Sequence, residues 1–323
     1  MDRKKFLKAA SVITLASLEG SSFMNDVFAG SLKRLPIIDT HQHLVDTRRF
    51  GANWSRPPIP GNYGVEEYQK AVKGLNLVKS VYMEVAVPAE KRREEALYAI
   101  ELCNDRSNST VGAIIRADLY DPGMKNHLSE FRNSSCIKGV RGSFNSRESV
   151  MDDQVVKNVR ILGEMNMSLD FSLLPSFLAP ACELVKACPE TTFLVNHCGN
   201  VDPRAFLSTD AYGKADHNAN EWQDAMSCLA MNKNAACKIS GIATRVKGLP
   251  VNADNLGPAI NQCLDIFGPD KVMFAADWPW CLPATDIRNW VQVLKAVVSE
   301  RPYEEQRKLF HDNAVKFYKL QNV

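Results

Sequence analysis

Residues 35–43 read LPIIDTHQH, an apolar run that ends in two histidines one residue apart. Alternate side chains of a β-strand share one face. His41 and His43 are therefore expected to project together from the end of a buried strand, with Gln42 turned away. Two imidazoles aimed at one point can hold a metal ion, a water molecule or a developing negative charge. Alternatively, the two histidines are polar residues at the end of a strand whose side chains form hydrogen bonds with their neighbours and have no catalytic role.

The chain that follows alternates between short apolar runs and amphipathic segments. A polar stretch rich in proline and glycine, residues 46–63, comes first and is long for a connection. Apolar runs typical of buried parallel strands then predict strands at 79–87, 111–119, 137–144, 168–174, 191–197, 235–241 and 271–277. Helical periodicity predicts helices at 65–75, 89–104, 123–132, 153–166, 179–188, 220–232, 252–267, 285–299 and 303–318.

Counting the opening strand, eight strands are each followed by a helix. Eight such units in one domain predict a single (β/α)8 TIM barrel with an extra C-terminal helix. A doubly wound open sheet also uses these units, but no glycine-rich dinucleotide fingerprint follows any strand. The length of 323 residues accommodates one large barrel without an interdomain linker.

In such a barrel, chemistry collects at the C-terminal ends of the strands. The residues expected there are His41, His43, Glu84, Arg116, Asp118, Arg141, His197 and Asp277, with Asp170 near the start of strand five. Ordinary strand positions are mostly Val, Ile and Leu. The enrichment in groups suited to hydrolysis favours an enzyme.

Five ordered motifs carry a family resemblance, and a sixth at the C-terminus agrees. They are IDTHQH at 38–43, GVR at 139–141, VNHCG at 195–199, CKISG at 237–241, FGPDKVMFAADWP at 267–279 and DNAVKFY at 312–318. The chain resembles the amidohydrolase superfamily, of the amidohydrolase 2 type. Within it, the chain is similar to the lactonase-like branch that contains L-fuconolactonase, L-rhamnonolactonase and 2-pyrone-4,6-dicarboxylate lactonase.

The resemblance implies catalytic roles that the residue chemistry supports. Asp277 would be the general base that takes a proton from the attacking water. His41, His43 and His197 would polarise the substrate carbonyl and stabilise the oxyanion, directly or through a bound metal. Alternatively, Asp277 would cap the helix that follows it, and His197 would be a buried histidine that forms a hydrogen bond within its own turn.

Five further residues are candidates for binding the substrate. Arg141 would orient a carboxylate or hydroxyl groups through its fork of donors, although a structural ion pair is the alternative. Arg116 and Glu84 are weaker candidates because a barrel-interior ion pair explains them as well. Trp54 and Trp278 would line a sugar-binding surface or else anchor the loop and the core.

A single metal ion is the only metal arrangement that the strand ends favour. Binuclear relatives use a lysine carboxylate at strand four and histidines at strands five and six, whereas strand four here offers Arg141 and strand five offers no histidine. One Zn²⁺ or Mn²⁺ would be held by His41, His43 and Asp277, with His197 near. The resemblance also implies that many lactonases of this branch need no metal, so the expected cofactor is none or one divalent ion.

The amino-acid composition limits the classes of molecule that the protein is expected to bind. There are 39 basic and 37 acidic residues, so no charge field suits nucleic acid or an anionic membrane surface, and a small-molecule substrate is expected. The oligomeric state is not readable from sequence. Nine cysteines include no C-x-x-C pair, which leaves a zinc ribbon or thioredoxin motif unsupported.

The N-terminus has the pattern of an export signal. A basic segment containing RKKFLK at 3–8 precedes a short, mildly apolar run and the small-residue site VFA at 27–29. Residues 1–29 are therefore predicted to be a Tat-like or Sec signal, residues 30–323 the barrel domain, and the location periplasmic. The alternative is a cytoplasmic protein with an amphipathic N-terminal helix. The apolar run is too short and polar for a stable membrane span.

Three functions are consistent with these features. The first is hydrolysis of a sugar-acid lactone by general-base activation of water. The second is a metal-dependent decarboxylase of the same superfamily, and the third is a non-catalytic periplasmic sugar-binding barrel.

Overall fold

The structure is a computed structural model that describes residues 35–50, 60–209 and 211–321. The predicted export signal and Trp54 lie outside the described residues. The region Pro36–Val323 forms one compact unit, to which the following description applies.

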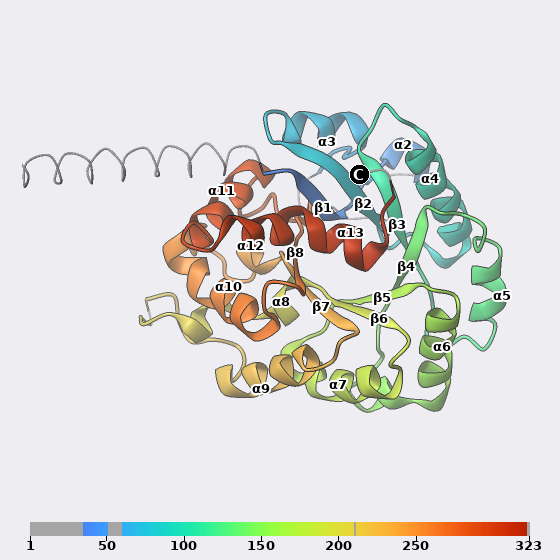
Figure 1. Cartoon of the computed structure of the whole chain (residues 1–323). Coiled ribbons are helices and arrows are strands. Elements are labelled where there is room, and N and C mark those ends of the chain that lie inside the picture. The colour runs from blue at the N-terminus through green and yellow to red at the C-terminus, as the bar shows by residue number, and fades with distance from the viewer. Residues whose placement is uncertain (1–34, 51–59, 210, 322–323) are drawn as a thin grey trace, which may run out of the picture. The chain divides into compact units, whose positions relative to one another are not determined.

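Eight parallel strands form a barrel in sequence order (Figure 1). They are β1 (Ile37–Gln42), β2 (Leu77–Met83), β3 (Thr110–Arg116), β4 (Ile137–Gly142), β5 (Ser168–Phe171), β6 (Thr192–Val195), β7 (Ala235–Ile239) and β8 (Val272–Phe274). The ring closes between its last and first strands, because Gln42 bridges Trp278 in parallel and Asp277 N–H donates to the carbonyl of His41 at 3.0 Å. The predicted (β/α)8 barrel is confirmed.

Helices surround this ring, and polar side chains cap several of them. The α-helices are α2 (Thr47–Phe50), α3 (Val65–Val72), α4 (Arg92–Asn104), α5 (Met124–Ser129), α6 (Asp153–Glu164), α7 (Leu178–Ala187), α8 (His197–Asn200), α9 (Ala219–Ala230), α10 (Ala253–Phe267), α11 (Ile287–Val297), α12 (Tyr303–Arg307) and α13 (Asn313–Tyr318). Asp152, Asn218, Asn252 and Asp286 accept N-terminal backbone N–H groups of α6, α9, α10 and α11. A π-helical segment, η6 (Lys308–Asp312), joins α12 to α13.

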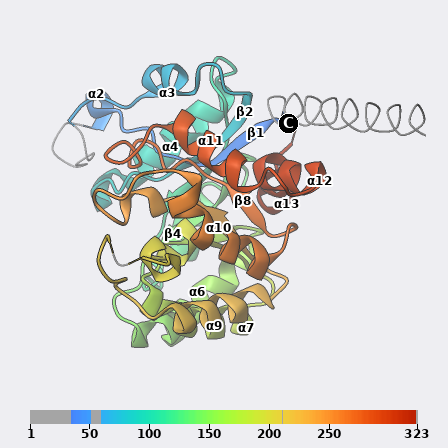
Figure 2. The ribbon, with the colours of Figure 1, turned by 90° about the vertical axis from the view of Figure 1, so that its left-hand side faces the viewer.

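The outer helices pack against their neighbours, as Figure 2 shows for α9 beside α7. Two disulfide bonds add covalent links, Cys103–Cys136 from α4 to the start of β4 and Cys182–Cys228 from α7 to α9. The other five cysteines are free and buried. In the described residues, no helix has the length and apolar character to cross a membrane.

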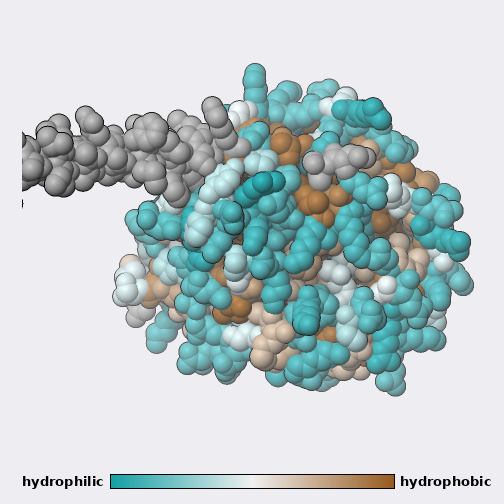
Figure 3. Space-filling model, in the orientation of Figure 1, coloured by the Kyte–Doolittle hydropathy of each residue, from teal (hydrophilic) through white to brown (hydrophobic). Residues whose placement is uncertain are grey.

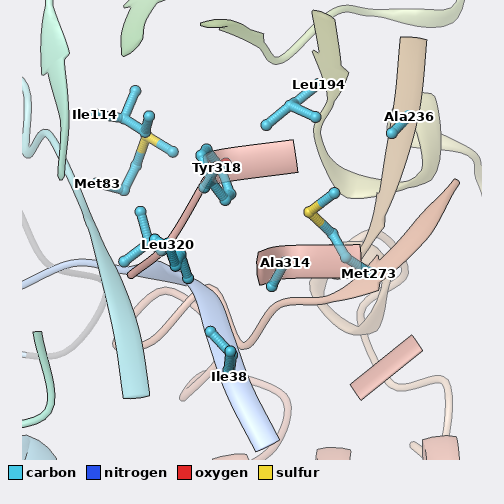
Figure 4. Close-up of a cluster of buried hydrophobic side chains, with 10 residues drawn as sticks. Ile38, Met83, Ile114, Leu194, Ala236, Met273, Ala314, Tyr318 and Leu320 are labelled. Atoms are coloured by element: carbon cyan, nitrogen blue, oxygen red, sulfur yellow. The ribbon is translucent and has the colours of Figure 1, made fainter. Parts of the chain in front are cut away.

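The C-terminal helix closes one end of the barrel. Ala314, Tyr318 and Leu320 point into a ring of apolar side chains from β1, β2, β3, β6, β7 and β8 (Figure 4). The helix lies at the N-terminal ends of the strands, because the side chain of Asn313 donates to the carbonyl of Val272 at the start of β8, and Lys138 near the start of β4 donates to the carbonyl of Lys319. The opposite end, where the strands finish, is therefore the open end at which a site can form.

The strands stop two to four residues earlier than the sequence pattern predicts. The difference matters because the predicted strand-end residues Glu84, Asp118, His197 and Asp277 lie just beyond the ends of their strands. His197 and Asp277 both have φ of +57°, which no strand residue adopts. The apolar pattern continues past the point where the backbone turns, so periodicity alone overextends the strands.

Candidate active site

His41 and His43 lie together at the carboxyl end of β1, as predicted. Their ring centroids are 4.8 Å apart, and their side chains are almost completely buried. The Nδ1 atom of His43 lies 3.1 Å from the carbonyl oxygen of Met83. A carbonyl can only accept, so Nδ1 carries the proton and, in the neutral ring, Nε2 carries the lone pair.

Asp277 reaches both histidines from the loop after β8. Its Oδ1 atom is 3.6 Å from His41 Nε2 and 3.5 Å from His43 Nε2. Two hydrogen bonds hold this arrangement where the first and last strands of the barrel meet. Asp277 N–H donates to the carbonyl of His41, and His43 N–H donates to the carbonyl of Trp278. The seam between the first and last strands therefore sets the distance between the carboxylate and the imidazoles.

His197, the first residue of α8 just after β6, completes the cluster. Its ring centroid is 4.7 Å from that of His41, and its Nδ1 is 3.0 Å from the hydroxyl of Ser240, which follows β7. The Ser240 hydroxyl orients the ring. Three imidazoles and one carboxylate from β1, β6 and β8 thus meet at the carboxyl end of the barrel.

Gly241 leaves the space that the His197 ring occupies. Its φ is +70°, and a Cβ there would lie 2.5 Å from His197 Cγ and Nδ1. We expect Gly241→Ala to displace the ring and lower kcat by about 100-fold, the effect of moving a catalytic group by about 1 Å. Gly248→Ala is the matched control, because Gly248 also has a positive φ, of +82°, but a Cβ would meet nothing within 4 Å. Equal losses in the two variants would contradict the explanation.

The electrostatic environment keeps His41 and His197 neutral and the Asp277 carboxylate charged. Burial lowers the pKa of His197 to about 4 and the pKa of His41 well below its usual value. Burial alone would raise the pKa of Asp277, but the neighbouring His197 and His43 outweigh it, and the pKa is lowered. The cluster therefore presents neutral lone pairs beside a carboxylate.

This cluster fits one divalent metal ion. Neither ring nitrogen of His41 has a hydrogen-bond partner although the residue is fully buried, and such orphaned atoms are rare unless a ligand satisfies them. Ligand atoms of His41, His197 and Asp277 all lie within 4.8 Å of one another. The predicted ligands were His41, His43 and Asp277 with His197 near, whereas in this group His197 takes the place of His43.

Two arginines share one buried carboxylate beside the cluster. Glu84 Oε1 lies 3.3 Å from Arg141 Nη1 and 3.5 Å from Arg116 Nη1, and Glu84 Oε2 accepts the N–H of Ala86. Arg116 also donates to Ser143 Oγ at 2.8 Å. The ion pair anticipated for these residues is present, but one carboxylate between two guanidinium groups leaves a positive charge. Both arginine side chains remain about one-fifth exposed, at 20% and 23%.

Glu95 lies behind this group and gives the fold a pH dependence. It accepts hydrogen bonds from Val85 N–H and Tyr82 O–H, and burial together with the charge of Glu84 raises its pKa to about 8. The folded state thus holds a proton that the unfolded chain releases near its ordinary value, so the free energy of unfolding should fall as pH rises from about 4.5 to about 8.

Glu95→Gln should flatten this dependence, because a glutamine amide can still accept both bonds but does not titrate. Urea unfolding at several pH values between 5 and 9 measures the slope. An unchanged slope in the variant would assign the effect to another group.

Trp280, rather than Trp278, lies where it could contact a substrate. Trp278 is 2% exposed and packs edge-on against Tyr63 and Tyr68, so it belongs to the core beneath the site rather than to a substrate surface. Trp280 is partly exposed, and its ring centroid lies 4.7 Å from that of His43. Sequence reasoning missed Trp280, although its position two residues after Trp278 in the same motif was a usable signal.

Two other strand-end candidates have structural roles. Asp170 is buried in an ion pair with Lys238 Nζ at 2.6 Å, and Asp118 is exposed and accepts the N–H of Tyr120. Lys238 also donates to the carbonyl of Thr40, next to His41. Lys238 was missed as well; a lysine inside an apolar strand of a barrel that also holds Asp170 was the signal. His217 accepts the N–H of Asp202 within its loop.

A (β/α)8 barrel with imidazoles and a carboxylate clustered at the carboxyl ends of its strands is the architecture of an enzyme that acts on small molecules. The amidohydrolase family model matches residues 38–320. The chain belongs to the amidohydrolase family.

Known proteins of similar sequence or structure agree with this membership. An L-fucono-1,5-lactonase of Burkholderia multivorans is 24% identical over 297 residues, covering 88% of this chain and 96% of the relative. The solved structure of an amidohydrolase from Burkholderia multivorans with bound zinc has a TM-score of 0.73 at 21% identity, covering 88% of this chain and 99% of that one. A probable 2-pyrone-4,6-dicarboxylic acid hydrolase from Acinetobacter baumannii with bound citric acid has a TM-score of 0.69 at 18% identity, with coverage of 88% and 99%. The family assignment makes the chain a hydrolase of the superfamily.

Proposed function

We propose that this enzyme is a lactonase that opens the cyclic ester of a sugar acid. The observation that carries the proposal is the Asp277 carboxylate, held 3.5 and 3.6 Å from two imidazoles in a site that keeps it ionised. The relatives named as lactonases support the ester as the bond attacked.

In the proposed reaction, Asp277 removes a proton from water as the water attacks the lactone carbonyl. The oxyanion that forms lies beside His41, His43 and His197, where the positive charge of Arg141, which also acts on His197 and Asp277, would stabilise it. The proton on Asp277 returns to the leaving alkoxide as the ring opens. Arg141 and Arg116, which share one counter-charge, orient the carboxylate or hydroxyl groups of the substrate.

A divalent metal held by His41, His197 and Asp277, with His43 near, would supply Lewis acidity to the carbonyl when bound. The orphaned nitrogens of His41 are the observation that favours it. The same observation favours the second candidate, a metal-dependent decarboxylase.

The test of the lactonase proposal is a screen of the purified protein against a panel of aldonolactones with a pH indicator. Acid release with at least one lactone, lost in Asp277→Asn, would support the proposal, and a flat response across the panel would overturn it. Metal analysis of protein purified without added metal, and activity after chelation, separate the candidates. Full lactone hydrolysis in a metal-free preparation eliminates the decarboxylase. Retained ligand binding without turnover in Asp277→Asn argues against a purely sugar-binding role.

Trp280 is expected to form one wall for the substrate, because its partly exposed ring lies against His43. Trp280→Ala should raise KM about tenfold and change kcat less, since the ring contributes contact area rather than chemistry. Trp280→Phe, which keeps an aromatic face, should restore most of the affinity. A fall in kcat at constant KM would instead indicate that the ring positions His43.

We also propose that the chain is exported and folds in an oxidising compartment. Two disulfide bonds support this, because disulfides persist mainly outside the cytosol. Thiol titration of denatured protein isolated from the periplasmic fraction should find five free thiols without reductant and nine with it. Nine thiols without reductant would overturn the proposal.

A further inference from the structure

A second group of cations lies at the opposite end of the barrel from the active site. Two adjoining hollows, of about 230 and 860 Å³, share Ser134, Ser135, Lys138 and Gln321. Their walls include the first residues of four strands, Thr110, Ile137, Ser168 and Thr192. This end faces away from the carboxyl edge that holds Asp277. We call the combined space the basic groove.

Five basic side chains and two acidic ones line the basic groove. The basic residues are Lys79, Arg106, Arg132, Lys138 and Lys319, and the acidic residues are Asp105 and Glu190. In the described part of the chain, none of the five cations has a carboxylate oxygen within 4.0 Å. Arginines elsewhere are commonly paired, as in Arg49–Glu101, Arg93–Glu130, Arg204–Asp202, Arg245–Asp216 and Arg301–Asp265.

Lys138 lies at the centre of the groove, because it lines both hollows. Its ammonium group donates to the carbonyl of Lys319 at 3.3 Å, and burial together with the nearby Lys319 charge lowers its pKa. A like charge beside a part-buried ammonium is unfavourable unless an anion compensates it. The lining also supplies neutral donors, among them Ser134, Ser135 and Asn133.

We propose that the basic groove binds a soluble small molecule that carries two or more phosphate groups. A phosphate carries up to two charges and accepts several hydrogen bonds, which matches lysine, arginine and hydroxyl donors on one wall. The volume is that of a small-ligand pocket rather than of a polymer track. The face on which α13 lies is largely hydrophilic, with scattered apolar patches (Figure 3). The site is separate from the proposed lactonase chemistry.

The test is calorimetric titration of the full-length enzyme with fructose 1,6-bisphosphate, beside inorganic phosphate, at constant ionic strength. We expect saturable binding of the bisphosphate, tighter than that of phosphate. The double variant Lys79→Gln with Arg106→Gln should weaken it at least about fivefold. Lys70→Gln with Lys157→Gln is the matched control, because it removes the same charge from exposed positions outside the groove and should leave binding unchanged.

Three results would overturn the proposal: no saturable binding, equal weakening in the control, or loss of binding in Arg141→Gln with retention in the groove variant. The last would place the anion in the active site. Sedimentation with phosphatidylglycerol vesicles tests whether the groove binds the phosphate of a lipid headgroup. Vesicle binding without bisphosphate binding would also contradict the proposal of a soluble ligand. The groove variant should still hydrolyse lactones, so the failure of one proposal can be distinguished from the failure of the other.

Discussion

Asp277→Asn is expected to lower kcat for lactone hydrolysis by about 10²–10⁴-fold, the contribution of a positioned general base. The substitution tests the carboxylate alone, because asparagine has the same side-chain shape and allows the same backbone conformation. Asparagine tolerates the positive φ of +57° at this position. The backbone N–H of residue 277 can still donate to the carbonyl of His41.

The measurement is steady-state kinetics on the best lactone of the panel, with thermal unfolding to show that the variant is folded. Asp118→Asn is the matched control, because Asp118 is an exposed carboxylate in the loop after strand β3. It should retain nearly full activity. More than a tenth of the wild-type kcat in Asp277→Asn would refute its role as the base.

Lys238→Met is expected to reduce the free energy of unfolding by about 3–5 kcal/mol, because it leaves the Asp170 charge buried without its counter-ion. Both side chains are fully buried. Asp170 also accepts from Tyr318 O–H at 2.7 Å and from Ser168 Oγ at 3.1 Å. The ion pair therefore joins β5 and β7 to the C-terminal helix in the barrel interior.

The double variant Lys238→Met with Asp170→Asn should recover much of the loss. It removes the uncompensated charge, and the amide can still accept from Tyr318 and donate to Ser168. Denaturant unfolding of the three proteins measures the difference. A double variant no more stable than Lys238→Met alone would show that the penalty comes from lost packing rather than from the buried charge.

The order of elements and the members of the catalytic cluster were predictable from local pattern. Strand and helix periodicities repeat eight times, and H-x-H places two imidazoles on one face of any extended strand. The predicted helices agree with the structure to within a few residues, including the C-terminal segment from Tyr303 to Tyr318. The strand ends were less accurate, because His197 and Asp277 occupy left-handed backbone positions that an apolar pattern does not reveal.

Partners far apart in the chain were not predictable. The pairing of Lys238 with Asp170 spans 68 residues, and both cysteine pairings depend on which helices become neighbours. Trp278 and Trp280 look alike in sequence. Only the packing of Tyr63 and Tyr68 around the first of them leaves the second beside His43.

Local pattern is enough to predict a (β/α)8 barrel with histidines and Asp277 at the carboxyl ends of its strands, because the strand and helix periodicities repeat along the chain. Tertiary structure alone decided the distances within that set and the sharing of Glu84 by two arginines. It also decided which cations gather at the other end of the barrel without a carboxylate partner among the described residues. These features depend on closure of the ring, which brings β8 against β1 across more than 200 residues, and no local pattern encodes a contact at that separation.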